Sequence, residues 1–246
     1  MHNSACLTSQ RLGRHILLRP SRLLNVAVHA RSTAQGFGKS STVPKDLQMP
    51  KDVPVVSKLE WQRPLQLVKY PDPRLRAPNA KVGVFDASLM ELVNEMIPIM
   101  YQDDGVGLAA PQVGVNVRLM VFNPYGKEKP GAERVLVNPE IVAVSKERVA
   151  MEEGCLSFPK IYGPVDRPRD ITVRAQNEKG EAVTLTLGGP EDEAMWVSRI
   201  FQHEYDHLNG TLFHDRMKSS VLESVRAKLL ALEEGFVKAH PGLAVQ

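Results

Sequence analysis

One short motif restricts this chain more than any other feature, namely His203-Glu204-Tyr205-Asp206-His207. The residues around it predict a helix over about 194–208. Four helical residues advance by roughly 400°, so the imidazoles of His203 and His207 lie on one face of that helix. Two imidazoles at this spacing can bind one metal ion, with Glu204 beside it as a candidate general base. The alternative is an exposed helix that carries two ordinary histidines.

A single helix supplies only two ligands, so a third must come from elsewhere. The downstream patterns of zinc proteases fit poorly, because His214 lies one residue late and Glu223 is badly placed. Upstream, Cys155 lies in the motif Glu-Gly-Cys-Leu-Ser. A lone cysteine is most often a small buried hydrophobe. A thiolate with two imidazoles would instead leave a fourth position open, which is the catalytic arrangement.

A third motif contains two closely spaced glycines, Gly-Val-Gly-Leu-Ala-Ala-Pro-Gln, over residues 105–112. No P-loop lysine follows it, and the dinucleotide-binding pattern fails at Ala110, where a third glycine is required. A phosphate site is therefore not indicated. The segment predicts either a glycine turn into a strand or a loop whose backbone approaches a ligand. In the second case the Gln112 amide is a hydrogen-bond donor.

The rest of the body combines helices with short β-rich runs. Apolar periodicity predicts three helices, over about 87–101, 194–208 and 218–235. Ser88 and Glu91 have the spacing of a capping box at the start of the first. Turn residues separate β-rich runs over 118–122, 134–137, 141–144, 171–175 and 183–187. Strands and helices without βαβ alternation predict an α+β fold.

Charge is distributed unevenly along the chain. The formal net charge is +3, yet residues 1–45 contain seven Lys and Arg and no acidic residue, so the remainder is net acidic. A leader rich in Arg and Ser and free of acid predicts an organellar transit peptide over 1–45, the alternative being a disordered basic tail. The acidic remainder indicates no nucleic-acid partner. The sequence contains no run of 18 apolar residues, so it predicts no membrane span.

The chain divides into four parts by composition. After the leader we expect an extended linker over 46–64, a catalytic domain over 65–237 and a C-terminal tail over 238–246. Every candidate site residue lies beyond Gly105. We therefore expect a chain that starts near Ser57 to fold and to be active.

Together, and in this order, the three motifs resemble those of peptide deformylases. The resemblance covers about residues 65–235 and is closer to the plastid and bacterial subgroup than to the mitochondrial one. It implies mostly antiparallel and mixed sheets packed around a central helix that carries His-Glu-x-x-His, with a C-terminal helix. It also implies a metal-dependent hydrolase that removes the formyl group from the N-terminal formylmethionine of newly made organellar proteins and releases formate.

The resemblance assigns roles to individual residues. Three would bind one divalent metal ion, Fe²⁺ with Zn²⁺ as the alternative: Cys155, His203 and His207. Glu204 would be the general base and acid. Gln112 and the backbone N–H of Leu156 would donate hydrogen bonds to the oxyanion. Three would contact the substrate: Val106, Gly107 and Gly154.

Partners and location also follow from the resemblance. The implied partners are N-formyl-Met nascent peptides, with a transient contact to the organellar ribosome. The implied location is the plastid stroma, with the mitochondrial matrix as the alternative. Two features depart from the family pattern and leave the pocket's shape open. Residues 188–195 form a longer and more acidic segment, and Trp196 and Arg199 replace commoner aliphatic residues.

Two other functions stay open on the residues alone. A zinc endopeptidase would use His203, Glu204 and His207 but would ignore Cys155 and cut internal bonds. A metal-stabilised binding module would close its site with a fourth protein ligand. Formate release, measured against cleavage of an internal peptide bond, separates these functions from deformylation.

Overall fold

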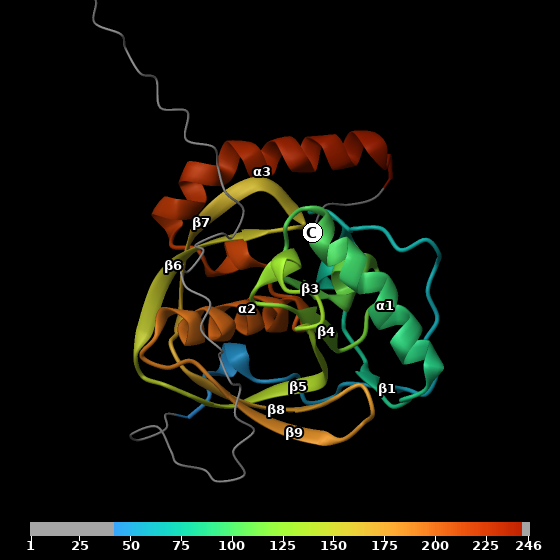
Figure 1. Cartoon of the computed structure of the whole chain (residues 1–246). Coiled ribbons are helices and arrows are strands. Elements are labelled where there is room, and N and C mark those ends of the chain that lie inside the picture. Colours follow the sequence, from blue (N-terminus) through green and yellow to red (C-terminus); the bar gives the residue numbers. More distant parts are fainter. Residues whose placement is uncertain (1–41, 243–246) are drawn as a thin grey trace, which may run out of the picture.

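Figure 1 shows the computed structural model, which describes residues 42–242. Most of the predicted transit peptide and the last residues of the predicted tail lie outside this range. The three helices are α1 (Ala87–Gln102), α2 (Asp192–Leu208) and α3 (Ser219–Ala239). The strands are β1 (Val55–Val56), β2 (Lys81–Val82), β3 (Gly107–Ala109), β4 (Leu119–Phe122), β5 (Arg134–Val144), β6 (Arg148–Cys155), β7 (Phe158–Pro168), β8 (Ile171–Gln176) and β9 (Ala182–Leu187).

The strands form three sheets. The largest has the order β3-β4-β5-β8-β9, and each pair of adjacent strands in it is antiparallel. Strands β6 and β7 form a long antiparallel hairpin, and β1 pairs with β2 in parallel. Strand β3, which begins in the glycine motif, is an edge strand of the largest sheet. The α+β expectation is therefore confirmed.

Helix α2 is the centre of the molecule and lies between the large sheet and the β6–β7 hairpin (Figure 1). Because successive side chains of a strand point to opposite faces of the sheet, the sheet packs against two hydrophobic clusters. Met120 and Phe122 of β4 belong to the cluster with α2, while Leu119 and Val121 belong to the cluster with α1. All residues of α2 from Trp196 onward are buried. The predicted central helix is thus confirmed.

The local boundaries differ from the expectation at two places. The cap of α1 is Asp86, whose carboxylate accepts hydrogen bonds from the Ser88 backbone N–H at 2.8 Å and the Ser88 hydroxyl at 2.6 Å, so the capping box at Ser88 is wrong. The runs over 134–137 and 141–144 belong to one strand, β5. Its register shifts at Asn138, which has a φ of 52°. The Asn-Pro pair therefore marks a β-bulge and not the end of a strand.

Residues 46–64 differ from an extended linker because they pack on the body. Leu47 and Leu59 are buried, in the clusters that contain α2 and α1 respectively. Val55 and Val56 form β1, and the Asp46 carboxylate accepts a hydrogen bond from Arg216 at 2.6 Å. Within residues 42–242, the helices include none that is long and apolar enough to cross a membrane.

Candidate active site

The two proposed histidine ligands and the proposed cysteine ligand meet where α2 faces the end of β6. One ligand atom from each of Cys155, His203 and His207 lies within 4.8 Å of the other two. The Cys155 Sγ is 3.3 Å from the His207 Nε2. A thiolate and two imidazoles at this separation suit one tetrahedral metal ion and leave its fourth position open. The donor set therefore fits a catalytic metal ion.

The β6–β7 turn places Cys155. The register of the hairpin shifts between Gly154 and Cys155, so that Cys155 pairs with Phe158 across a tight turn. A Cβ atom on Gly154 would lie 2.7 Å from the ring of Tyr162, which is closer than real Cβ contacts. The glycine therefore lets the two strands approach at the turn that carries the thiol. Neither strand was predicted from the sequence.

Glu153 orients His203. The His203 Nδ1 lies 2.9 Å from the Glu153 Oε2, and both side chains are buried. An ionised carboxylate only accepts hydrogen bonds, so Nδ1 carries the proton and Nε2 is left for a metal ion. Burial alone would raise the pKa of Glu153, but Arg167 and the hydrogen bond from His203 hold it well below its ordinary value. Burial likewise opposes a charge on His203, yet Cys155 and Glu153 raise its pKa well above the ordinary value.

Glu153 is the inner end of a chain of paired charges that we call the ion network. From Glu153 to the surface its members alternate in sign, with Arg199 as a second partner of Glu153: Glu153, Arg167, Asp206, Arg216 and Asp46. Arg167 donates two hydrogen bonds to Glu153, at 2.6 and 2.8 Å, and one to Asp206 at 2.6 Å. Sequence reasoning missed this network, although Glu153 is the first residue of the cysteine motif and offered a signal.

Replacing Arg167 by methionine is expected to destabilise the apo-protein by about 3 kcal/mol, because Glu153 and Asp206 would each lose a buried partner and keep only Arg199 and Arg216 respectively. Urea unfolding followed by fluorescence measures this. The matched control is Arg148→Met in the same hairpin, since Arg148 pairs with Asp166 at the surface. Such pairs contribute roughly 0–1 kcal/mol. Equal losses in the two variants would contradict the importance of the buried pairing.

Glu204 is buried and faces the edge strand β3. A Cβ atom on Gly107 would overlap the Glu204 carboxylate, so the glycine makes room for this side chain. Burial raises the pKa of Glu204 to about 7. Its Oε2 is buried without a hydrogen-bond partner among the described residues. A carboxylate with a pKa near neutrality and an unused oxygen can exchange a proton with a bound water or substrate.

The Gln112 amide is fixed in one orientation. Its Oε1 accepts a hydrogen bond from the Ala109 backbone N–H at 2.8 Å, within the 3₁₀ turn Ala110–Val113 that follows β3. Its Nε2 therefore faces the Cys155 Sγ at 3.5 Å and the Ser157 Oγ at 3.3 Å. This amide can direct an N–H toward an oxygen bound beside the thiolate. The glycine motif leads into a strand, β3, as the first alternative expects, and Gln112 still faces the pocket as the second expects.

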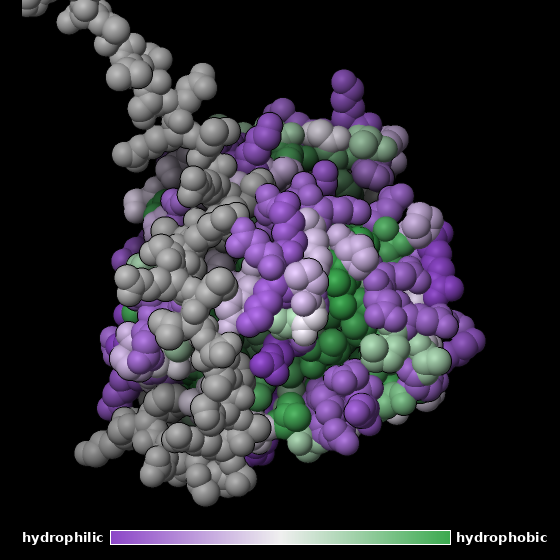
Figure 2. Space-filling model, in the orientation of Figure 1, coloured by the Kyte–Doolittle hydropathy of each residue, from purple (hydrophilic) through white to green (hydrophobic). Residues whose placement is uncertain are grey.

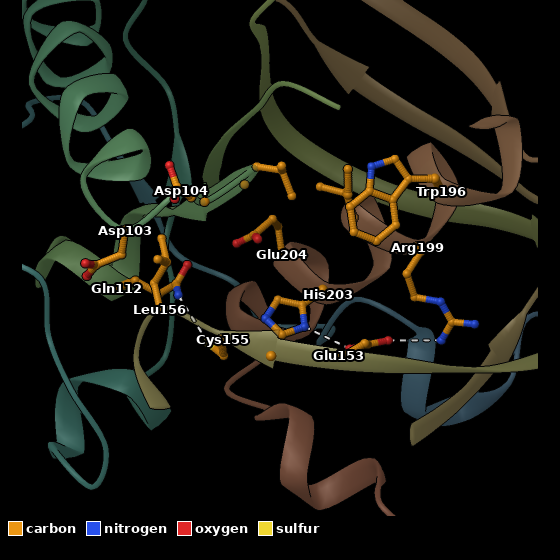
Figure 3. A pocket seen from close by; sticks show the side chains of 15 residues that line it. Asp103, Asp104, Gln112, Glu153, Cys155, Leu156, Trp196, Arg199, His203 and Glu204 are labelled. Carbon is orange, nitrogen blue, oxygen red and sulfur yellow. Dashed lines mark hydrogen bonds and ion pairs between the residues drawn. The ribbon is translucent and has the colours of Figure 1, made fainter. Parts of the chain in front are cut away.

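One pocket brings most of the predicted residues together (Figure 3). Glu204 lies near its centre, with Gln112 and Cys155 on one side and Trp196 and Arg199 on the other. The pocket is lined by eight predicted residues: Val106, Gly107, Gln112, Gly154, Cys155, Leu156, His203 and Glu204. His207 does not line it and reaches the ligand cluster from the next helical turn. Figure 2 shows a strip of hydrophobic surface beside α1, flanked by hydrophilic residues.

Of the two departures from the family pattern, only the second, Trp196 and Arg199, lies at this pocket, since no residue of 188–195 lines it. The Trp196 indole N–H donates to the Pro124 carbonyl at 3.3 Å, and its ring forms part of the wall. Arg199 donates to Glu153 at 3.0 Å and to the carbonyls of Val165 and Val149. Arg199 therefore belongs to the ion network, while Trp196 narrows the apolar wall. His214 lies elsewhere, beside Tyr70 and Phe158.

The fold and the site are those of a candidate metalloenzyme, with three residues that could hold a metal ion beside a pocket that a carboxylate lines. Residues 64–223 match the family model described as Polypeptide deformylase. The chain therefore belongs to the peptide deformylase family. Members of this family are metal-dependent hydrolases that remove the formyl group from N-terminal formylmethionine.

Individual relatives agree with this assignment. The chain is 47% identical over 218 residues to the rice chloroplastic peptide deformylase 1B, an alignment that covers 88% of this chain and 78% of that one. It is 49% identical over 178 residues to an Arabidopsis thaliana chloroplastic/mitochondrial 1B enzyme, covering 72% and 63% of the two. A plant peptide deformylase crystal structure superposes with a TM-score of 0.71 at 47% identity, covering 76% of this chain and 98% of that one. The Plasmodium falciparum enzyme gives a TM-score of 0.67 at 42% identity, covering 72% and 100%.

Proposed function

We propose that this chain deformylates nascent peptides in an organelle, with Cys155, His203 and His207 as the ligands of its metal ion. The observation that carries the proposal is the meeting of the Cys155 thiol with the two imidazoles of α2 at a pocket that Glu204 lines. When bound, the divalent ion supplies Lewis-acid polarisation of the formyl carbonyl and lowers the pKa of water. The chain's own residues transfer the proton, stabilise the oxyanion and bind the peptide.

Glu204 moves the proton. Its raised pKa lets the carboxylate accept a proton from the attacking water and hold it at neutral pH. The same carboxyl then gives the proton to the leaving amine nitrogen, and formate departs. The Gln112 Nε2–H and the Leu156 backbone N–H donate hydrogen bonds to the oxyanion that develops on the formyl oxygen.

The pocket and the edge of β3 bind the peptide. Val106 lines the pocket and would contact the methionine side chain. Because β3 is an edge strand, an extended peptide can pair with its free backbone groups next to Gly107. Gly154 lies on the opposite wall of the same pocket and would contact the substrate backbone there.

Formate release from formyl-Met-Ala-Ser tests this function. The metal-loaded protein is expected to release formate and to leave the internal bonds of a longer peptide intact. Cleavage of an internal bond without formate release would revive the endopeptidase alternative. Metal binding without either reaction would support a binding module.

We propose Fe²⁺ as the native ion, with Zn²⁺ as the alternative. A thiolate and two imidazoles accept either, and affinity does not decide which one a cell inserts. The proposal rests on the family resemblance. Metal analysis of protein purified without oxygen, followed by rate measurements on iron-loaded and zinc-loaded samples, tests it. We expect the iron-loaded sample to be faster, and an equally active zinc-loaded sample would favour Zn²⁺.

We propose the plastid stroma as the location, with the mitochondrial matrix as the alternative and a transient contact with the organellar ribosome. The basic, acid-free composition of residues 1–45 supports a transit peptide, and relatives named chloroplastic support the plastid. A fluorescent fusion of residues 1–60 should enter plastids. Uniform cytosolic fluorescence would contradict the targeting role.

A further inference from the structure

A short segment ahead of the family's core, residues 43–48, packs next to the central helix. It contains the 3₁₀ turn Lys45–Leu47, drawn in blue below α2 in Figure 1. Leu47 is 3% exposed and belongs to the buried cluster that includes Ile200, Phe201 and Tyr205 of α2. Val43 packs against the same cluster. The segment is therefore anchored in the same hydrophobic core as the helix that carries both histidines.

Asp46, the residue before Leu47, is the surface end of the ion network. The Asp46 carboxylate accepts a hydrogen bond from the Arg216 Nη1 at 2.6 Å. Arg216 donates two further bonds to Asp206, both at 2.6 Å. Asp206 precedes the ligand His207 on α2 and also pairs with Arg167. Contacts thus run without a gap from Asp46 through Arg216, Asp206, Arg167 and Glu153 to His203.

Asp46 also balances the charge of this network. With Asp46 there are three carboxylates and three guanidinium groups, and without it the network carries one excess positive charge. The Arg216 side chain is only 15% exposed, so water solvates it poorly in place of the carboxylate. An excess positive charge on residues that hold metal ligands opposes binding of a divalent cation.

We propose that residues 43–48 are a positioning segment of the active site. Asp46 is the positioning residue, acting through Arg216 and Asp206 on the ligands of α2, and Leu47 anchors it. The inference rests on the proposed roles of His203 and His207 as ligands. It implies that any cleavage that removes the transit peptide occurs upstream of Val43. It also replaces the expectation that a chain starting near Ser57 is fully active, since such a chain lacks both residues.

Metal release from the full-length protein tests this inference. Each variant is loaded with Co²⁺, whose thiolate absorption reports Cys155 ligation, and release to excess chelator is timed. Asp46→Asn should release Co²⁺ about threefold faster at low salt, in the range of one partly exposed ion pair. The difference should shrink at ~0.5 M NaCl through screening, and Asp46→Glu should restore the slow rate. Glu91→Gln is the control, since the Glu91 side chain is about as exposed as that of Asp46 and pairs with Arg63, which is outside the ion network.

Leu47→Ala should lower Tm by about 5–15 °C and speed Co²⁺ release about tenfold, as loss of support around metal ligands does. Leu59→Ala is the matched control, because Leu59 is another buried leucine of the N-terminal segment but packs in the α1 cluster. It should lower Tm similarly and leave release unchanged.

Three outcomes would overturn the inference. Unchanged release in Asp46→Asn would remove the charge argument, and equal acceleration by Leu47→Ala and Leu59→Ala would show a general effect of destabilisation. A wild-type protein without the cobalt–thiolate absorption would overturn the ligand assignment together with this inference. The first two outcomes leave the proposed function intact.

Discussion

Glu204→Ala is expected to keep its metal ion and to lose formate release by about 10,000-fold or more. A single general acid–base group contributes roughly 100- to 10,000-fold. Glu204 would act in both attack and amine expulsion, so its loss should lie at or above the upper end. The carboxylate belongs to none of the three proposed ligands, so metal content should not change. The measurement is formate release from formyl-Met-Ala-Ser, with metal content determined on the same sample.

Glu204→Asp should recover little activity. The carboxylate occupies space that Gly107 leaves free, and the shorter side chain withdraws it from that position. Glu204→Gln, which preserves the shape, should be as inactive as the alanine variant because it cannot carry the proton. A metal-loaded Glu204→Ala protein that retains more than about a tenth of the wild-type rate would exclude the general-base role, since that loss lies below the range for such groups.

Cys155→Ala is expected to lose most of its bound metal. Removing one of three protein ligands should cost several kcal/mol of metal-binding free energy, about a third of the ~10–16 kcal/mol of structural sites. The Cys155 Sγ lies 3.3 Å from the His207 Nε2 in the cluster of three candidate ligand atoms, so its removal leaves two of them. Metal-to-protein ratios after desalting measure the loss.

His214→Ala is the control for Cys155→Ala. His214 lies in the cluster of rings formed with Tyr70, Phe158 and Phe213, and its Nε2 is 3.5 Å from the Asp215 Oδ1. Its removal should leave the metal content unchanged. A fully loaded Cys155→Ala protein beside a metal-free His214→Ala protein would refute the proposed ligand set and favour the protease pattern.

Local patterns predicted the elements that carry the chemistry. The helical period placed His203 and His207 on one face, and α2 spans the residues expected for it. The β-rich runs coincide with β4, β5, β8 and β9, except that Arg118 lies one residue before β4. Cys155 could be named as a ligand only with the family resemblance, because it lies 52 residues from His207 and on a strand that the sequence did not predict.

What surrounds the ligands was not predictable from local patterns. Arg167 and Glu153 read as ordinary surface charges, yet they are paired and buried at 1% exposure. Asp46 and Arg216 are 170 residues apart in the chain, and nothing in either local sequence indicates the other. The composition of residues 46–64 is typical of a linker, although Leu47 and Leu59 are core residues.

The sequence alone determined the pair of histidines and the candidate general base, because helical spacing and ligand chemistry act over a few residues and leave a motif, and the reaction class followed once the family resemblance was added. Only the tertiary structure decided which charges orient His203, how Gly107 makes room for Glu204, and that Leu47 packs in the core. The physical reason is that a buried charge is tolerated only beside its partner, and the partner is chosen by packing in space rather than by distance along the chain.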